Sequence, residues 1–193
     1  CAASAARTRD ALVAAAPLSG GLIETGPHPY QSNAHMHLLE ACMAWEEAGG
    51  NGDWRGLSDR IARLALTRFI DADEGFLREF FEADWTPALG EDGSLVEPGH
   101  QFEWAWVLAR YARLRSDAEA LAAARRLYAF GLKGVEPQRR IVVDALNADG
   151  SFRSRRARLW PQTEWLKAAL ILAEESQGAA RGIFLPDAAR PQR

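Results

Sequence analysis

One helix start decides how the rest of the chain is interpreted, and it runs Glu97-Pro98-Gly99-His100-Gln101-Phe102-Glu103-Trp104-Ala105-Trp106. Helical spacing of about 100° per residue puts His100, Glu103 and Trp106 along one side. The Pro-Gly pair predicts that the helix begins near His100, where the helix dipole disfavours positive charge and keeps the imidazole neutral. A neutral histidine accepts protons, so this stretch holds a candidate base. A histidine satisfied inside a helical core is the alternative.

Length and composition predict one globular domain that acts on small molecules. The chain has 193 residues, of which 48% are hydrophobic and 25% charged, as in ordinary folded domains. Its formal net charge is −3, with 23 basic and 26 acidic residues, which argues against binding to nucleic acid or to an anionic membrane. No apolar run reaches membrane-spanning length, and no signal peptide is recognisable. The two cysteines, Cys1 and Cys42, cannot form a disulfide framework, so we expect a protein of the reducing cytoplasm.

Apolar spacing and helix breakers predict helices over 2–16, 37–49, 54–70, 100–114, 117–131 and 160–176. Residues 75–85 look extended, 89–93 resemble a loop, and 142–151 predict a β-hairpin that closes on Asp149-Gly150. The tail 178–193 shows no periodicity, so we expect it to be disordered or aberrant and to follow a single domain over 1–177. Because the chain begins inside an uncapped alanine-rich helix, we expect a fragment of a longer protein.

Three helix starts repeat along the chain. Their glutamates, Glu40, Glu103 and Glu164, are 63 and 61 residues apart. Each repeat holds two helices and an optional hairpin, so the period predicts stacked helical hairpins that present equivalent helix ends on one side. A ring of such hairpins would gather these ends around a central cavity. An open solenoid with the same spacing remains the alternative.

Polar side chains accompany each repeated helix start. The pairs are Asn33 with His37, His100 with Glu103, and Trp160 with Glu164, each on one helix face. Three such pairs are more than a core requires, and they predict a polar cavity with an aromatic floor. Sugar rings favour such a site, because aromatic faces cover their apolar side while directed polar groups bind their hydroxyls.

Other chemistries fit the same residues less well. His35 and His37 point about 200° apart on a helix, and neither they nor Cys1 and Cys42 complete a metal-ligand set. We therefore expect no metal and no cofactor, with His35 hydrogen-bonded or exposed. Glu103 and Glu164 as the acid and nucleophile of a glycosidase stay a minor alternative that leaves the histidines idle. The arginines in 153–158 are most simply solvated, although a contact to a phosphate is open to them.

The three helix starts resemble those of the N-acylglucosamine 2-epimerase family. The motifs are Ser32-Asn33-Ala34-His35-Met36-His37-Leu38-Leu39-Glu40-Ala41, Pro98-Gly99-His100-Gln101-Phe102-Glu103-Trp104-Ala105-Trp106 and Trp160-Pro161-Gln162-Thr163-Glu164-Trp165. The likeness covers roughly residues 1–176, and three ordered motifs are far more specific than one. It implies an all-α fold that forms part of an (α/α)6 barrel, with short inserted β-hairpins.

The resemblance also implies a site and a reaction. Asn33, His37, Trp106, Trp160 and Glu164 would bind the sugar, while His100 and Glu103 would be catalytic. The chemistry takes the proton from C2 of an opened sugar to give an enediol. The proton then returns to C1 in an isomerase, or to the opposite face of C2 in an epimerase. Glu103 would orient His100, whose ordinary pKa of about 6.5 suits proton transfer, and no metal is needed.

Family members are longer, and they supply an arginine and a second catalytic histidine from segments without a counterpart here. We therefore expect this chain alone to be weak or inactive. The motifs look most like the mannose and mannose-6-phosphate isomerase branch, so we expect aldose–ketose isomerisation of a sugar or sugar phosphate. An N-acylglucosamine or cellobiose 2-epimerase is the alternative, as is a truncated toroid that binds sugar or protein without catalysis. A homodimer is left open.

Overall fold

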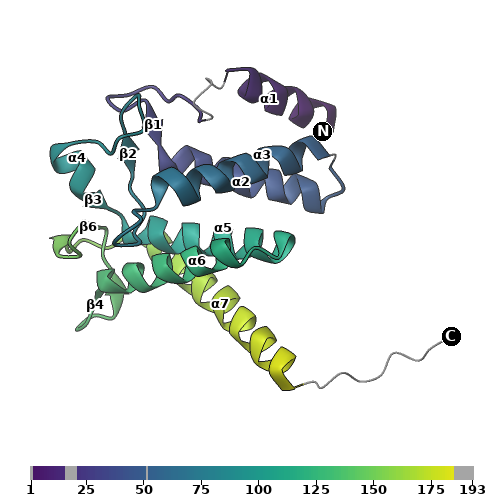
Figure 1. Cartoon of the computed structure of the whole chain (residues 1–193). Helices are drawn as coiled ribbons and strands as arrows, with labels where there is room; N and C mark the ends of the chain where they lie inside the picture. The colour runs from purple at the N-terminus through teal and green to yellow at the C-terminus, as the bar shows by residue number, and fades with distance from the viewer. Residues whose placement is uncertain (1, 16–20, 51, 185–193) are drawn as a thin grey trace.

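The computed structural model describes residues 2–15, 21–50 and 52–184 as a set of helical hairpins (Figure 1). The long helices are α1 (Ala2–Ala15), α2 (Ser32–Glu47), α3 (Gly52–Leu64), α5 (Pro98–Arg115), α6 (Ala118–Gly131) and α7 (Trp160–Phe184). Helix α2 packs against α3, and α5 packs against both α6 and α7. None of the helices in these ranges is long and apolar enough to cross a membrane. The predicted succession of helical hairpins is confirmed.

Short strands gather at the end of the molecule where α2, α5 and α7 begin, on the left of Figure 1. Strand β1 (Tyr30–Gln31) pairs antiparallel with β2 (Phe80–Phe81). Strand β6 (Ala145–Asn147) pairs with both β3 (Leu95–Val96) and β7 (Phe152–Ser154), and β4 (Val135–Glu136) pairs with β5 (Ile141–Val142). Each strand pair fixes the backbone close to a helix start, so the sheets hold these starts in register.

The predicted hairpins are partly right. The β6–β7 hairpin closes on Asp149-Gly150, where Gly150 has a φ of +84°, a conformation that favours glycine. In the segment 75–85 the extended conformation is confirmed at β2, but its partner is the distant β1. The expected loop 89–93 contains one turn of helix, α4 (Gly90–Ser94). Local patterns predict extended backbone but do not identify a partner that lies far along the chain.

The turn between α5 and α6 follows from two residues. Ser116 ends α5 in the left-handed conformation, with a φ of 56°, and Asp117 caps α6 by accepting a hydrogen bond from the Ala120 N–H at 3.0 Å. The two residues satisfy backbone groups that the helix ends leave free, so the chain reverses within two residues.

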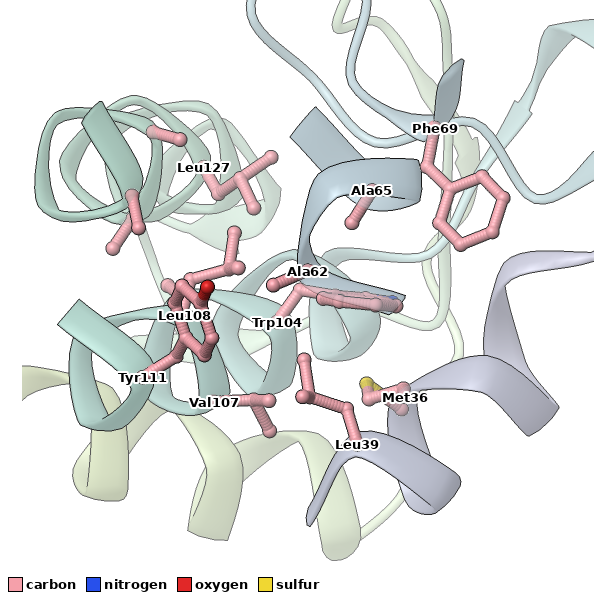
Figure 2. Close-up of a cluster of buried hydrophobic side chains, with 14 of the residues drawn as sticks. Met36, Leu39, Ala62, Ala65, Phe69, Trp104, Val107, Leu108, Tyr111 and Leu127 are labelled. Carbon is pink, nitrogen blue, oxygen red and sulfur yellow. The ribbon is translucent and has the colours of Figure 1, made fainter. Parts of the chain in front are cut away.

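Trp104 lies at the centre of the core. Its side chain is fully buried between Met36 and Leu39 of α2 and Ala62 and Ala65 of the α3 segment (Figure 2). Helix α3 continues there as a π-helix, Ala65–Phe69. Because α5 is apolar on nearly every side, it packs between its neighbours as a central helix, and its first turn is thereby held inside the molecule.

Two predicted helix ends need correction. Helix α2 begins at Ser32, five residues before the expected His37, directly after strand β1. Helix α7 continues to Phe184, so the expected end at Ser176 and irregular chain from 178 onward are wrong for residues 178–184. A single glycine, Gly178, costs a helix only about 1 kcal/mol relative to alanine, and the residues beside it are good helix formers. Residues 185–193 lie outside the described ranges.

The opposite ends of the helices are joined by ion pairs. Arg113 of α5 contacts Glu174 and Glu175 of α7 at 3.0 and 2.7 Å. Arg110 contacts Glu47, the last residue of α2, at 2.7 Å. Arg113, Glu174 and Glu47 are between 44% and 66% exposed, whereas Arg110 and Glu175 are 21% and 22% exposed, so the pairs are partly screened by solvent and each contributes little on its own.

Candidate active site

The first turns of α2, α5 and α7 surround a pocket of about 470 Å³. Its lining residues are Asn33, His37, Glu97, His100, Glu103, Arg158, Trp160 and Glu164. Six of the seven predicted site residues are therefore brought together, although the three helix starts are far apart in the sequence. The pocket establishes that these residues lie together, and their role in binding and transforming a sugar stays a prediction.

Trp160 forms an aromatic wall of the pocket beside His100. The centroids of the two rings lie 5.3 Å apart, with their planes tilted by 40°. The indole ring packs directly against the backbone of Gly99. A Cβ at position 99 would lie only 2.3 Å from the Trp160 ring, so a larger residue would displace the indole. Pro98 and Gly99 are already helical, so the expected turn ahead of the helix is wrong. The glycine serves the close approach of Trp160.

His100 is hydrogen-bonded to a residue that the sequence analysis did not single out. Its Nδ1 lies 2.9 Å from Oε2 of Glu79, a carboxylate that is only 5% exposed. Glu79 also accepts hydrogen bonds from the Ser32 hydroxyl at 3.3 Å and from the Glu97 N–H at 3.2 Å. The expected partner of the imidazole, Glu103, is therefore replaced by Glu79. The one signal in the sequence is an acidic residue within the apolar stretch 76–81.

The charge of His100 also differs from the expectation. Burial lowers the pKa of the imidazole, but the carboxylates of Glu79, Glu97 and Glu103 outweigh it and raise the pKa to about 9. The shift is thus opposite in direction to the one expected from the helix N-terminus, and the surrounding carboxylates favour the protonated ring. Carboxylates within hydrogen-bonding reach stabilise the imidazolium more strongly than the helix dipole opposes it.

Glu103 is a buried carboxylate between α2 and α7. Its residue is 8% exposed, and Oε1 lies 3.8 Å from Nδ1 of His37. Burial raises the pKa of Glu103, as does Glu164, while His37, His100 and Lys167 act in the opposite direction. The 3.8 Å separation from His37 is too long for a hydrogen bond, and no other donor within the described chain lies close to the Glu103 carboxylate. This carboxylate can therefore accept a hydrogen bond from a ligand.

Glu164 is held from outside the pocket by Lys167, whose Nζ lies 2.7 Å from Oε2. The same Nζ lies 4.0 Å from the ring centroid of Trp106, which also contacts the guanidinium of Arg110 at 4.8 Å. Trp106 is not one of the residues that line the pocket. Trp106 contacts Lys167, and Lys167 in turn pairs with Glu164. The predicted contact between Trp106 and a sugar therefore stays a prediction.

Arg158 and Glu97 complete the rim and were not predicted as site residues. Arg158 Nη2 lies 3.1 Å from Glu97 Oε2, and its Nε lies 2.9 Å from Asp144 Oδ1. Its guanidinium also stacks 5.3 Å from the Trp160 ring centroid. Arg158 belongs to the arginines interpreted as solvated. Its side chain is 51% exposed, as that interpretation requires, and it also pairs with two carboxylates. Glu97 could have been suspected as the residue immediately before the helix.

His35 is a structural residue, as expected. It is 1% exposed, its Nδ1–H donates to the Gln31 carbonyl at 2.6 Å, and its Nε2 accepts from the Leu22 N–H at 2.9 Å. Burial lowers the pKa of this imidazole, which the hydrogen bond to Gln31 partly opposes. The ring therefore joins the loop at Leu22 to helix α2.

His37, Glu40 and Glu103 could together hold a metal ion. One ligand atom from each lies within 4.8 Å of the others. The sequence analysis tested His37 against His35 instead and expected no metal. One imidazole and two carboxylates suit a divalent cation by ligand type, but two of the three residues also line the pocket, where the hydroxyls of a ligand would compete for them.

Comparisons with known proteins agree with the fold and with the family resemblance. The model of the N-acylglucosamine 2-epimerase (GlcNAc 2-epimerase) family matches residues 17–183. A mannose-6-phosphate isomerase of Rhizobium meliloti (strain 1021) is 52% identical over 178 residues, which are 90% of this chain and 46% of the relative. A D-mannose isomerase of Thermobifida fusca is 28% identical over 166 residues, which are 77% of this chain and 40% of the relative.

A solved structure shows the same fold. The crystal structure of a D-mannose isomerase superposes with a TM-score of 0.79 at 21% identity, over 93% of this chain and 49% of that chain. The expected all-α fold, part of an (α/α)6 barrel, is confirmed. The chain spans about half the length of the relatives it matches. It belongs to the N-acylglucosamine 2-epimerase family.

Proposed function

We propose that this pocket binds an aldose and that the protein interconverts it with the ketose, as in the conversion of mannose or mannose 6-phosphate to the fructose form. The observation that carries the proposal is the grouping of His100, Glu103 and Trp160 in one pocket with His37 and Glu164. Two relatives described as isomerases of mannose or its phosphate support the choice of sugar. The chain spans less than half of each of these relatives, so we propose the activity for the protein of full length.

Binding would use the pocket's complementary surfaces. The Trp160 ring offers an apolar face for the C–H groups of a sugar. The carboxylates of Glu103 and Glu164 accept hydrogen bonds from hydroxyls, and the amide of Asn33 can donate and accept. A sugar hydroxyl would give Glu103 the close donor that it otherwise lacks among the described residues, so binding would offset the cost of burying this carboxylate.

Proton transfer would centre on His100. As an imidazolium it donates a proton to the ring oxygen while the carboxylate of Glu103 takes the proton of the O1 hydroxyl, so that the ring opens and an aldehyde forms. The neutral imidazole then takes the proton from C2, and the C–H electron pair becomes the C1–C2 double bond. The former carbonyl oxygen gains a proton from a second acid. Return of the proton to C1, with loss of the O2 hydroxyl proton to the conjugate base of the second acid, gives the ketose. Return to the other face of C2, with loss of the O1 proton to the same base, gives the epimer.

The test follows the C2 proton of D-mannose, mannose 6-phosphate and N-acetylglucosamine by NMR in deuterated water. We expect mannose to quench the tryptophan fluorescence of the 193-residue chain at millimolar concentrations. We also expect slow exchange at C2 that His100→Asn abolishes while the helical content stays unchanged. Fructose as the product supports isomerisation, whereas glucose or N-acetylmannosamine supports the epimerase.

Two results contradict the proposal. The first is a folded chain that binds none of these sugars. The second is exchange at C2 that persists in His100→Asn. Binding without exchange in a polypeptide that spans the full length of the relatives would instead support a non-catalytic sugar-binding toroid. The matched control is Glu119→Gln, which removes a carboxylate that is 60% exposed and pairs with Arg63 away from the pocket.

A further inference from the structure

Glu79 contacts the starts of two helices, α2 and α5, from an extended segment outside them. Its Oε2 accepts from His100 Nδ1–H at 2.9 Å and from the Ser32 hydroxyl at 3.3 Å, and its Oε1 accepts from the Glu97 N–H at 3.2 Å. Its backbone carbonyl accepts from the Ser32 N–H at 3.0 Å. Strand β2, which begins at the next residue, pairs with β1 just before α2. Glu79 therefore links the starts of α2 and α5.

We propose that Glu79 is a positioning residue for the reaction, one that fixes the His100 imidazole with Nδ1 protonated and leaves Nε2 as the nitrogen that exchanges protons with the sugar. The proposal rests on the function proposed above. Glu79 is buried behind the pocket and is not one of its lining residues, so it would act through His100 and not on the sugar.

The geometry restricts the imidazole in two ways. The hydrogen bond to Glu79 holds one ring nitrogen, while the Trp160 ring lies 5.3 Å away and limits rotation of the histidine. When the imidazole loses a proton, the carboxylate retains the one on Nδ1, because a carboxylate accepts hydrogen bonds and cannot donate one. The proton that leaves is then the one on Nε2, and the same nitrogen is the one that can take the C2 proton.

A carboxylate suits this position better than an amide. Three donors converge on the two oxygens of Glu79: an imidazole N–H, a hydroxyl and a backbone N–H. A glutamine would turn its NH2 group toward at least one of these donors, which leaves a buried donor without an acceptor. It would also remove the buried negative charge that stabilises the imidazolium.

Several other charges face His100 and contribute to its titration. Glu97 and Glu103 lie on the same helix start and favour the protonated ring. Arg158 pairs with Glu97, His37 faces Glu103 from α2, and Glu164 and Lys167 face Glu103 from α7. Glu79 is distinguished from all of these by its direct hydrogen bond to the ring. Its removal should therefore change the proton affinity of His100 more than the loss of any of the others.

The experiment follows the imidazoles by ¹⁵N and ¹³C NMR across pH 5 to 10, with His100→Asn used to assign the signal of His100. We expect the neutral form of His100 in the wild-type chain to carry its proton on Nδ1. In Glu79→Gln we expect the titration midpoint to fall by at least one pH unit, about a tenfold loss of proton affinity. The matched control is Glu82→Gln, which removes a carboxylate 3.3 Å from His28, three residues along the same segment, and should leave His100 unchanged.

These spectra need no sugar turnover, so failure of this inference is distinguishable from failure of the proposed function. An Nε2-protonated neutral form in the wild type would overturn the inference even if Glu79→Gln does not fold. An unchanged His100 midpoint in a folded Glu79→Gln chain would also overturn it. Where exchange at C2 is measurable, kcat should fall and the pH profile should shift with the midpoint, while KM for mannose changes less than about twofold.

Discussion

Nδ1 of His37 lies 3.8 Å from Oε1 of Glu103, so the first turns of α2 and α5 face each other across the candidate active site. This separation is too long for a hydrogen bond, and it leaves both groups free to engage a hydroxyl between them. The buried carboxylate is therefore the more informative of the two to change.

We predict that Glu103→Gln weakens mannose binding by about tenfold, which corresponds to about 1.4 kcal/mol. The amide retains one acceptor but loses the charge that strengthens a hydrogen bond from a hydroxyl. Fluorescence titration with mannose measures the change, and Glu119→Gln should bind as the wild type does. Unaltered affinity in a folded Glu103→Gln chain would remove Glu103 from the binding site.

A second prediction concerns two glycines with different surroundings. Gly99→Ala should destabilise the chain by about 1 to 3 kcal/mol, the range of overpacked cores, and weaken mannose binding, because its Cβ would displace the Trp160 ring. Gly56→Ala should instead stabilise it by about 0.5 to 1 kcal/mol, because Gly56 is exposed within α3 and nothing lies within 4 Å of an added Cβ. Urea unfolding and fluorescence titration measure both. Equal effects of the two substitutions would contradict the close approach of Trp160 to Gly99.

The third prediction is a loss of stability at alkaline pH. The folded chain raises the pKa of His100 to about 9, so its contribution is fully present below about pH 6.5 and disappears as the pH rises through 9. We expect the free energy of unfolding to decrease by about 2 to 4 kcal/mol between pH 6.5 and 10, since one pKa unit corresponds to about 1.4 kcal/mol. Burial raises the pKa values of Cys42 and Tyr111 to about 12, so these groups add to the decrease only above about pH 8.5, where they begin to lose protons in the unfolded chain.

Urea unfolding at several pH values measures this slope. In His100→Asn the decrease between about pH 6.5 and 8.5, below the range in which Cys42 and Tyr111 contribute, should be largely absent. A slope of the same size in that variant would show that another group is responsible and that the imidazolium does not stabilise the fold.

The fourth prediction concerns metal removal. We expect dialysis against EDTA to leave mannose binding and C2 exchange unchanged, because a histidine can transfer the proton without a Lewis acid. Loss of exchange that Mn²⁺ or Zn²⁺ restores would contradict this. It would direct attention to His37, Glu40 and Glu103, whose ligand atoms lie within 4.8 Å of one another.

The repeat predicted most of the pocket but not the residue behind it. His37, His100 and Glu164 could be found because equivalent helix starts in stacked hairpins converge on one side. Glu79 lies in an extended segment between repeats, and the β1–β2 pairing brings it to the pocket. Periodicity within a segment contains no information about such a long-range pair, so a carboxylate in an apolar stretch was the one available signal.

The charge of His100 could not be predicted from the helix alone. A helix N-terminus contributes typically about 0.3 to 1 kcal/mol against a positive charge. A carboxylate in direct hydrogen-bonding contact contributes more, and here Glu79 is reinforced by Glu97 and Glu103. The sign of the shift therefore depends on tertiary contacts that a local motif does not specify.

The two ends of the helical hairpins should differ in their response to ionic strength. At the pocket, β1 directly precedes α2 and β3 lies just before α5, so backbone hydrogen bonds between strands hold these helix starts. At the other end, Arg113 and Arg110 join the helices through partly exposed ion pairs, which dissolved salt screens. Arg115, only 8% exposed, pairs there with Glu46 and Asp59 at 2.7 Å and is screened less. Concentrated sodium chloride should therefore weaken the Arg110 and Arg113 pairs, while Arg115 keeps its partners and the arrangement of Asn33, His100 and Trp160 stays intact.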